Sequence, residues 1–158
     1  MGRLGGGMED RGAMIDIKVM LPRQQVEAFK AEGIPYGRPR VVKGLIDTGA
    51  SCSAIDRETA EDMKLVSHGF TFIHTPSTGS DYARRLQYAA CLVVGEDQAD
   101  PLVATLPVIE CDFSTRDFKL LVGRDVLRSC TFSYDGPTDT FALEWDRERQ
   151  YPATVGRQ

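Results

Sequence analysis

Short apolar segments separated by turn-forming residues run through most of the sequence, and this pattern restricts the fold more than any other feature. In residues 14–21, apolar and polar side chains alternate as in a strand with one buried face, and Pro22 ends the segment. Residues 85–94 repeat this alternation. Strands are predicted at 14–21, 41–46, 70–74, 85–94, 102–109, 118–122, 131–134 and 140–145. Seven or eight short strands indicate a mainly β domain, closed or folded back on itself.

Helices are expected to be few and short. The pattern favours one helix at 57–65, with Asp56 as its N-cap, and a single helical turn at 124–128. Residues 23–40 stay ambiguous, because a short helix-like spacing is followed by repeated glycines and prolines.

The chain has 158 residues, which is the size of one domain. We expect residues 14–145 to form that domain. Residues 1–13 have no apolar stretch of the kind found in a secretion signal, and they are expected to be a flexible leader. Residues 146–158 are polar and are expected to be a flexible tail.

Charge and hydropathy narrow the class of partner. The 19 Lys and Arg residues are outnumbered by 23 Asp and Glu, whereas proteins that follow a phosphate backbone are normally basic. No apolar run is long enough to cross a bilayer. We therefore expect neither a nucleic-acid partner nor a membrane partner. The pair Arg84 and Arg85 is expected to be solvated surface.

The cysteines and histidines do not suggest a metal site. No Cys-x-x-Cys pair occurs, and the four cysteines are widely spaced: Cys52, Cys91, Cys111 and Cys130. They are expected to be free thiols in a reducing compartment, with the cytoplasm as the default. His68 and His74 fit neither the spacing of a metal pair on a helix nor that on a strand. No metal or cofactor is expected.

The segment most informative about chemistry is 44–50, GLIDTGA. An apolar strand runs directly into Asp47, whose carboxylate would be costly to bury unless hydrogen bonds hold it. Gly49 permits a turn that other residues resist, and its amide can approach the carboxylate closely. The Thr48 hydroxyl can bond to neighbouring backbone. The simpler alternative is an aspartate that caps its own loop, and the three-residue motif alone leaves both interpretations open.

A second segment repeats this arrangement. Residues 120–127, LLVGRDVL, again form an apolar strand followed by glycine and a helical turn. With both segments present, residues 14–145 resemble a retropepsin, the family of single-lobed aspartic proteases that includes the retroviral proteases. The order of elements also agrees, because a strand ending in Asp-Thr-Gly-Ala is followed by a hairpin, a further strand and Gly-Arg-Asp. The resemblance implies a retropepsin-like closed β-barrel with one or two short helices.

The resemblance assigns roles to a few positions. It implies that Asp47 is the catalytic carboxylate and that Thr48 bonds to its symmetry mate across a dimer axis. Gly49 would offer its amide to the carboxylate and its carbonyl to a bound peptide. Support for this active-site loop is implied for Thr48, Gly49, Ala50, Gly123 and Arg124.

The resemblance also implies a flap, a hairpin that closes over the peptide. The flap and substrate-binding residues would be Ser77, Thr78, Gly79 and Ser80. This tip has fewer glycines than the retroviral members have, and those members lack a helix at 57–65. They also carry an aspartate two residues after the glycine of the motif, and it pairs with the arginine. Here that residue is Ser51, so Arg124 needs another partner.

One chain supplies only one such carboxylate, because no second Asp-Thr-Gly or Asp-Ser-Gly occurs. Aspartic proteolysis needs two carboxylates about 3 Å apart that share a proton, so two copies would have to pair, each contributing Asp47. The sequence therefore predicts an aspartic endopeptidase that acts as a homodimer on a peptide or protein substrate. A non-catalytic peptide-binding or dimerisation module on the same fold is the alternative. An unrelated β-barrel ligand binder with a coincidental motif is a third possibility.

Overall fold

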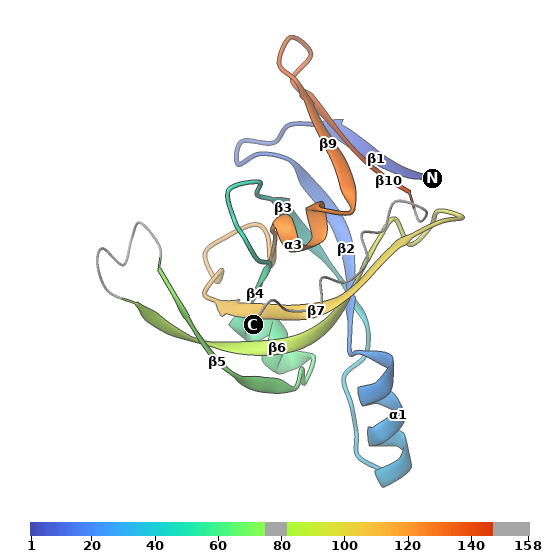
Figure 1. Cartoon of the computed structure of the whole chain (residues 1–158), viewed down its shortest axis with the longest axis vertical. Coiled ribbons are helices and arrows are strands. Elements are labelled where there is room, and N and C mark those ends of the chain that lie inside the picture. Colours follow the sequence, from blue (N-terminus) through green and yellow to red (C-terminus); the bar gives the residue numbers. More distant parts are fainter. Residues whose placement is uncertain (75–81, 147–158) are drawn as a thin grey trace, which may run out of the picture.

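The structure, a computed structural model, describes residues 1–74 and 82–146 (Figure 1). About half of these residues are in strands. The strands are β1 Gly2–Gly7, β2 Met14–Met20, β3 Arg40–Ile46, β4 Ala54–Asp56, β5 Ser67–Ile73, β6 Ala83–Val94, β7 Leu102–Cys111, β8 Leu120–Val122, β9 Cys130–Asp135 and β10 Thr140–Trp145. The helices are α1 Arg23–Glu32, α2 Arg57–Asp62 and α3 Arg124–Leu127.

Six strands form a closed barrel (Figure 1). Their order is β2-β3-β8-β4-β7-β6, and the ring closes because β2 also pairs with β6. β5 continues the sheet beyond β6 and forms a hairpin with it. The mainly β, closed fold expected from the alternating segments is confirmed.

The strands that lead to the glycine-containing loops are anchored in the barrel core. Ile46, the last residue of β3, is buried, and so are Leu120 and Val122 of β8. Burying each such aliphatic side chain contributes about 1.5–3 kcal/mol. The loops that follow β3 and β8 therefore start from fixed points.

The first residues form a strand, which corrects the expectation of a flexible leader at 1–13. β1 pairs antiparallel with β10, from Gly2 opposite Trp145 to Gly7 opposite Thr140, and β9 completes a three-stranded sheet. β1 is glycine-rich, so no alternation of apolar side chains reveals it, and backbone hydrogen bonds to β10 order it instead. Within the expected tail 146–158, the residues from 147 onward lie outside the described part of the chain.

Helix α1 settles the ambiguous segment 23–40. Its first ten residues are helical, and Gly33 ends the helix in the left-handed conformation at φ 67°. α1 projects away from the barrel between β2 and β3 (Figure 1), and none of its residues is fully buried.

Helix α2 is shorter than the predicted 57–65. It ends at Asp62, and Lys64 adopts a left-handed φ of 54°. Asp56 stands at the N-cap position but does not cap the backbone of α2 with its side chain. Its carboxylate instead accepts hydrogen bonds from the Thr59 hydroxyl and, at 2.8 Å, from the Phe113 amide. Asp56 thus ties α2 to the segment after β7.

Candidate active site

The two glycine-containing loops meet because β8 lies between β3 and β4. β8 pairs in parallel with β3 and antiparallel with β4. The Asp47 amide donates to the Val122 carbonyl at 3.0 Å, and the Arg124 amide donates to the Ala50 carbonyl at 2.9 Å. These two backbone bonds fix the loop after β3 to the loop after β8.

Asp47 is the first residue after β3, and its side chain is half-buried. The Gly49 amide donates to its Oδ1 at 2.8 Å. A Cβ on Gly49 would lie 3.1 Å from the same oxygen, so a larger residue would crowd the carboxylate. Gly49 has no positive φ, which corrects the expected reason for this glycine: close approach to the carboxylate requires it, not an unusual turn.

Arg124 finds its partners in backbone carbonyls. Its Nη1 donates to the Thr48 oxygen at 2.9 Å and to the Gly49 oxygen at 3.1 Å. The guanidinium therefore braces the Asp47 loop within one chain, although Ser51 provides no carboxylate to pair with it. Thr48 and Gly49 are themselves exposed. The contact of Thr48 across a dimer axis stays a prediction.

Behind the loops lies a buried network that the sequence interpretation did not assign. The Ser53 side chain is completely buried, and its hydroxyl donates to Asp125 Oδ1 at 2.7 Å. Its amide donates to Asp125 Oδ2 at 2.8 Å, and the Gly123 amide donates to the Ser53 hydroxyl oxygen at 3.0 Å. Asp125 belongs to the Gly-Arg-Asp segment, and this was the only sequence signal for the network.

Gly123 packs directly against the backbone of the other loop. A Cβ at this position would lie 2.5 Å from the Cys52 carbonyl carbon and 3.0 Å from the Ser53 amide nitrogen. No real side chain fits at such distances. Gly123 therefore lets the two loops approach closely enough for the Ser53 network to form.

A groove of about 580 Å³ runs beside the loop that follows Asp47, where Ser51 and Cys52 line it. Its walls come from the loop, from β5 and β6, from β7, and from the end of α3. Asp47 does not line this groove. The expected flap residues Ser77, Thr78, Gly79 and Ser80 lie outside the described residues.

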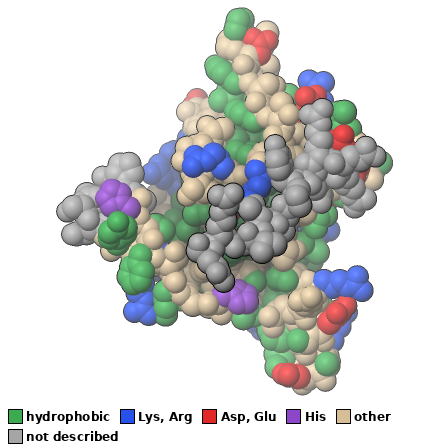
Figure 2. Space-filling model, viewed as in Figure 1, with side chains coloured by type: hydrophobic (Ala, Val, Ile, Leu, Met, Phe, Trp, Pro, Cys, Tyr) green, Lys and Arg blue, Asp and Glu red, His purple; other side chains and the backbone are tan. Residues whose placement is uncertain are grey.

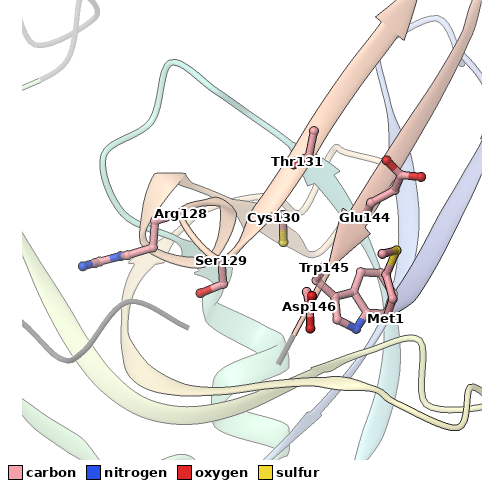
Figure 3. Close-up of a pocket in the computed structure, with 8 residues that line it drawn as sticks. All are labelled: Met1, Arg128, Ser129, Cys130, Thr131, Glu144, Trp145 and Asp146. Atoms are coloured by element: carbon pink, nitrogen blue, oxygen red, sulfur yellow. The ribbon is translucent and has the colours of Figure 1, made fainter. Parts of the chain in front are cut away.

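A second cavity, of about 280 Å³, lies at the ends of β9 and β10 (Figure 3). Trp145 forms part of its wall, and its indole Nε1 donates to the Asp100 carbonyl at 2.7 Å. Met1 also lines the cavity, and its ammonium group pairs with the Asp100 carboxylate at 3.2 Å. None of residues 47–50 takes part, so this cavity is separate from the candidate active site.

Two of the four cysteines have thiols of low reactivity. Burial raises the pKa of Cys130 to about 11 and raises the pKa of Cys111, so both thiols stay protonated at neutral pH. Within residues 1–74 and 82–146, no cluster of three or more potential ligands could hold a metal ion. No helix in that part of the chain is both long and apolar enough to span a membrane.

Comparison with known proteins identifies the fold. No protein-family model and no curated protein matches the sequence. Among solved structures, the chain is similar to a retropepsin-like aspartic protease from Rickettsia conorii, with a TM-score of 0.56 and 16% identity over 91% of each chain. It is also similar to the retroviral protease-like domain of Ddi1 from Leishmania major, with a TM-score of 0.42 and 13% identity over 87% of this chain and 98% of that chain. The first likeness shows that the chain has a retropepsin-like fold, as the sequence motifs predicted.

Proposed function

We propose that the chain is an aspartic endopeptidase that acts as a homodimer. The observation that carries the proposal is the Asp47 carboxylate, held by the Gly49 amide on a loop of a retropepsin-like lobe. Thr48 and Gly49 are exposed beside it, so a second copy of the chain can approach this loop. The sequence holds no second copy of the motif, which is why the proposal needs two chains.

In the proposed dimer, the two Asp47 carboxylates lie about 3 Å apart and share one proton, because two like charges at that distance cannot both ionise. The ionised carboxylate removes a proton from a water molecule, whose oxygen attacks the peptide carbonyl carbon. The protonated carboxyl gives its proton to the carbonyl oxygen. The tetrahedral diol then collapses, the C–N bond breaks, and a proton passes to the departing amine.

The substrate class follows from the fold. An extended peptide would bind between the subunits as an added strand, with its main chain paired to the flap and to the active-site loop. The Gly49 carbonyl, which Arg124 already contacts, is one acceptor available for that pairing. Two carboxylates that share a proton are active between their two apparent pKa values, so the rate should be bell-shaped in pH with an optimum below neutrality.

The direct test is hydrolysis of a denatured protein substrate by the full chain and by Asp47→Asn. The substitution keeps the size of the side chain and an acceptor for the Gly49 amide, but removes the shared proton. Asp139→Asn is the matched control, because Asp139 also precedes a threonine but lies in a turn beside Tyr134. We expect hydrolysis to be abolished by the first change and retained with the second. Equal rates in the wild type and Asp47→Asn would contradict the proposal.

Subunit mixing tests the homodimer. Wild type and Asp47→Asn are mixed in varying proportions at constant total protein, and dimers that contain one inactive copy lose the carboxylate pair. Activity should then fall with the square of the wild-type fraction after the subunits have exchanged. A fall in simple proportion to the wild-type fraction would indicate that one chain is active by itself.

A further inference from the structure

The β5–β6 hairpin has two faces of different chemistry. On one face, Phe70 and Phe72 are 54% and 68% exposed, and the Arg84 guanidinium lies 3.4 Å from the centroid of the Phe70 ring. Figure 2 shows hydrophobic side chains exposed on the left of the molecule, where Figure 1 places this hairpin. Because side chains alternate along a strand, Arg85 lies on the opposite face.

That opposite face borders the groove. Arg85 is paired with Thr71 across the hairpin, and Gln87 is the next residue of β6 on the same side. Both Thr71 and Gln87 line the groove beside the active-site loop. Arg85 does not itself line the groove, but it lies on the same face of the hairpin as these two residues. It is therefore not on the solvated surface that the sequence suggested for the pair Arg84 and Arg85.

Arg85 is a half-buried cation without a counter-charge. Its Nε is inaccessible to solvent and has no hydrogen-bond partner among the described residues. No ion pair within residues 1–74 and 82–146 includes this side chain. Arg85 lies close enough to the Cys111 thiol for their charges to interact: burial raises the pKa of Cys111, and the Arg85 charge opposes that rise. A protonated thiol does not neutralise the guanidinium.

The rest of the groove does not supply the missing negative charge. Among the described residues that line it, Asp125 is the acid and Arg128 the base. Both carboxylate oxygens of Asp125 already accept hydrogen bonds, from Ser53 and from the Val126 amide. The lining therefore carries one charge of each sign, and Arg85 beside it adds a positive charge that no described carboxylate pairs with.

We infer that Arg85 is a specificity-determining residue, which binds an acidic side chain of the peptide substrate at the edge of this groove. The inference rests on the proposed function, because it names the substrate class of that function. A carboxylate binds a guanidinium through charge-assisted hydrogen bonds. Because Nε is covered by the protein, the terminal nitrogens of this half-buried side chain are the donors left for such a ligand.

The test measures selectivity with two pools of fluorescent random octapeptides, which differ only in containing Asp and Glu or Asn and Gln. Cleavage by the full chain is compared with cleavage by Arg85→Gln, Arg85→Lys and the control Arg84→Gln, which changes the arginine on the outer face. We expect kcat/KM to favour the acidic pool by about tenfold in the wild type and in Arg84→Gln. The preference should disappear in Arg85→Gln and persist, reduced, in Arg85→Lys.

A binding measurement separates this inference from the proposed function. The affinity of the two pools is measured by fluorescence anisotropy on Asp47→Asn, with and without Arg85→Gln, so no hydrolysis is needed. Tighter binding of the acidic pool that requires Arg85 supports the inference, even if the wild type shows no hydrolysis that depends on Asp47. Equal affinity for both pools overturns it. It is also overturned if Arg85→Gln weakens self-association while leaving selectivity unchanged, because the acid would then come from the partner subunit.

Discussion

The Arg124 Nη1 lies 2.9 Å from the Thr48 carbonyl oxygen, and through this bond the segment after β8 holds the loop that carries the aspartate. The same nitrogen contacts the Gly49 carbonyl. A cation that binds backbone carbonyls fixes the path of the chain without depending on any side chain of the loop. The Asp47 loop is thereby positioned in the single chain, before any partner is present.

Replacing Arg124 should therefore damage activity more than stability. Arg124→Met removes both carbonyl contacts, and a misplacement of about 1 Å near reacting groups can lower a rate a hundredfold. We expect kcat to fall by at least about tenfold, while the thermal midpoint changes little because Arg124 is exposed. Steady-state kinetics and thermal unfolding on the same samples provide the measurement. Arg116→Met is the control. An equal loss of activity in Arg116→Met would contradict the role of the Arg124 carbonyl contacts in positioning the Asp47 loop.

Ser53→Ala should destabilise the fold. The change leaves the buried Gly123 amide without its acceptor and Asp125 without one of its donors. Leaving such buried groups unpaired costs about 1–3 kcal/mol. Urea unfolding of Ser53→Ala and of Ser51→Ala gives the comparison, because Ser51 is exposed and its loss should cost less than about 0.5 kcal/mol. Similar values for the two variants would show that the network contributes nothing.

Gly123→Ala should destabilise the fold more than an alanine at most other glycine positions does. The new Cβ would have to displace the Cys52 backbone, from which it would lie 2.5 Å. Forcing an extra methyl into such a contact costs about 1–3 kcal/mol or more. Gly7→Ala is the control, because nothing lies within 4 Å of a Cβ there. If circular dichroism shows equal thermal midpoints for the two variants, the close approach of the loops is not required.

Stability should fall in strongly alkaline solution through Tyr88. Burial, together with the Glu110 carboxylate 3.0 Å from its hydroxyl, raises the pKa of Tyr88 to about 12, against about 10 in an unfolded chain. The folded state thus holds the proton more tightly. The associated stability is fully present below pH 10 and is lost as the pH rises from 10 to 12, by up to roughly 3 kcal/mol.

The measurement is the free energy of unfolding in urea at pH 9, 10, 11 and 12, for wild type and for Tyr88→Phe. Phenylalanine has no proton to lose, so the alkaline slope should be smaller in that variant. Tyr82→Phe serves as the control, because this tyrosine is 69% exposed. Parallel slopes for all three proteins would show that Tyr88 does not carry the effect.

The sequence was most informative where strands carry alternating or continuous apolar side chains. The strand before Asp47 and the strand before Gly123 were both predicted from short apolar runs, and the likeness of the two loops followed from them. The partners of Arg124 were not predictable, because they are backbone carbonyls, which every residue has. β1 was not predicted, because its glycines give no alternation of apolar and polar side chains.

The environment of Arg85 was predicted wrongly for a different reason. Two adjacent arginines suggested a solvated surface, yet in a strand adjacent residues face opposite sides. The predicted strand at 85–94 already reached this pair, so extending its alternation by one residue would have separated Arg84 from Arg85. The absence of a partner for Arg85 could only come from the structure, because it depends on which groups surround the guanidinium.

Because Gly2 pairs with Trp145, the fold can be completed only after Trp145 has been synthesised. The first strand leaves the ribosome long before its partner β10 has been made, so residues 2–7 must wait while strands β2 to β8 assemble. Contacts between distant parts of a sequence form slowly, because the intervening chain loses entropy when they close. Any truncation that removes β10 therefore also releases the opposite end of the chain.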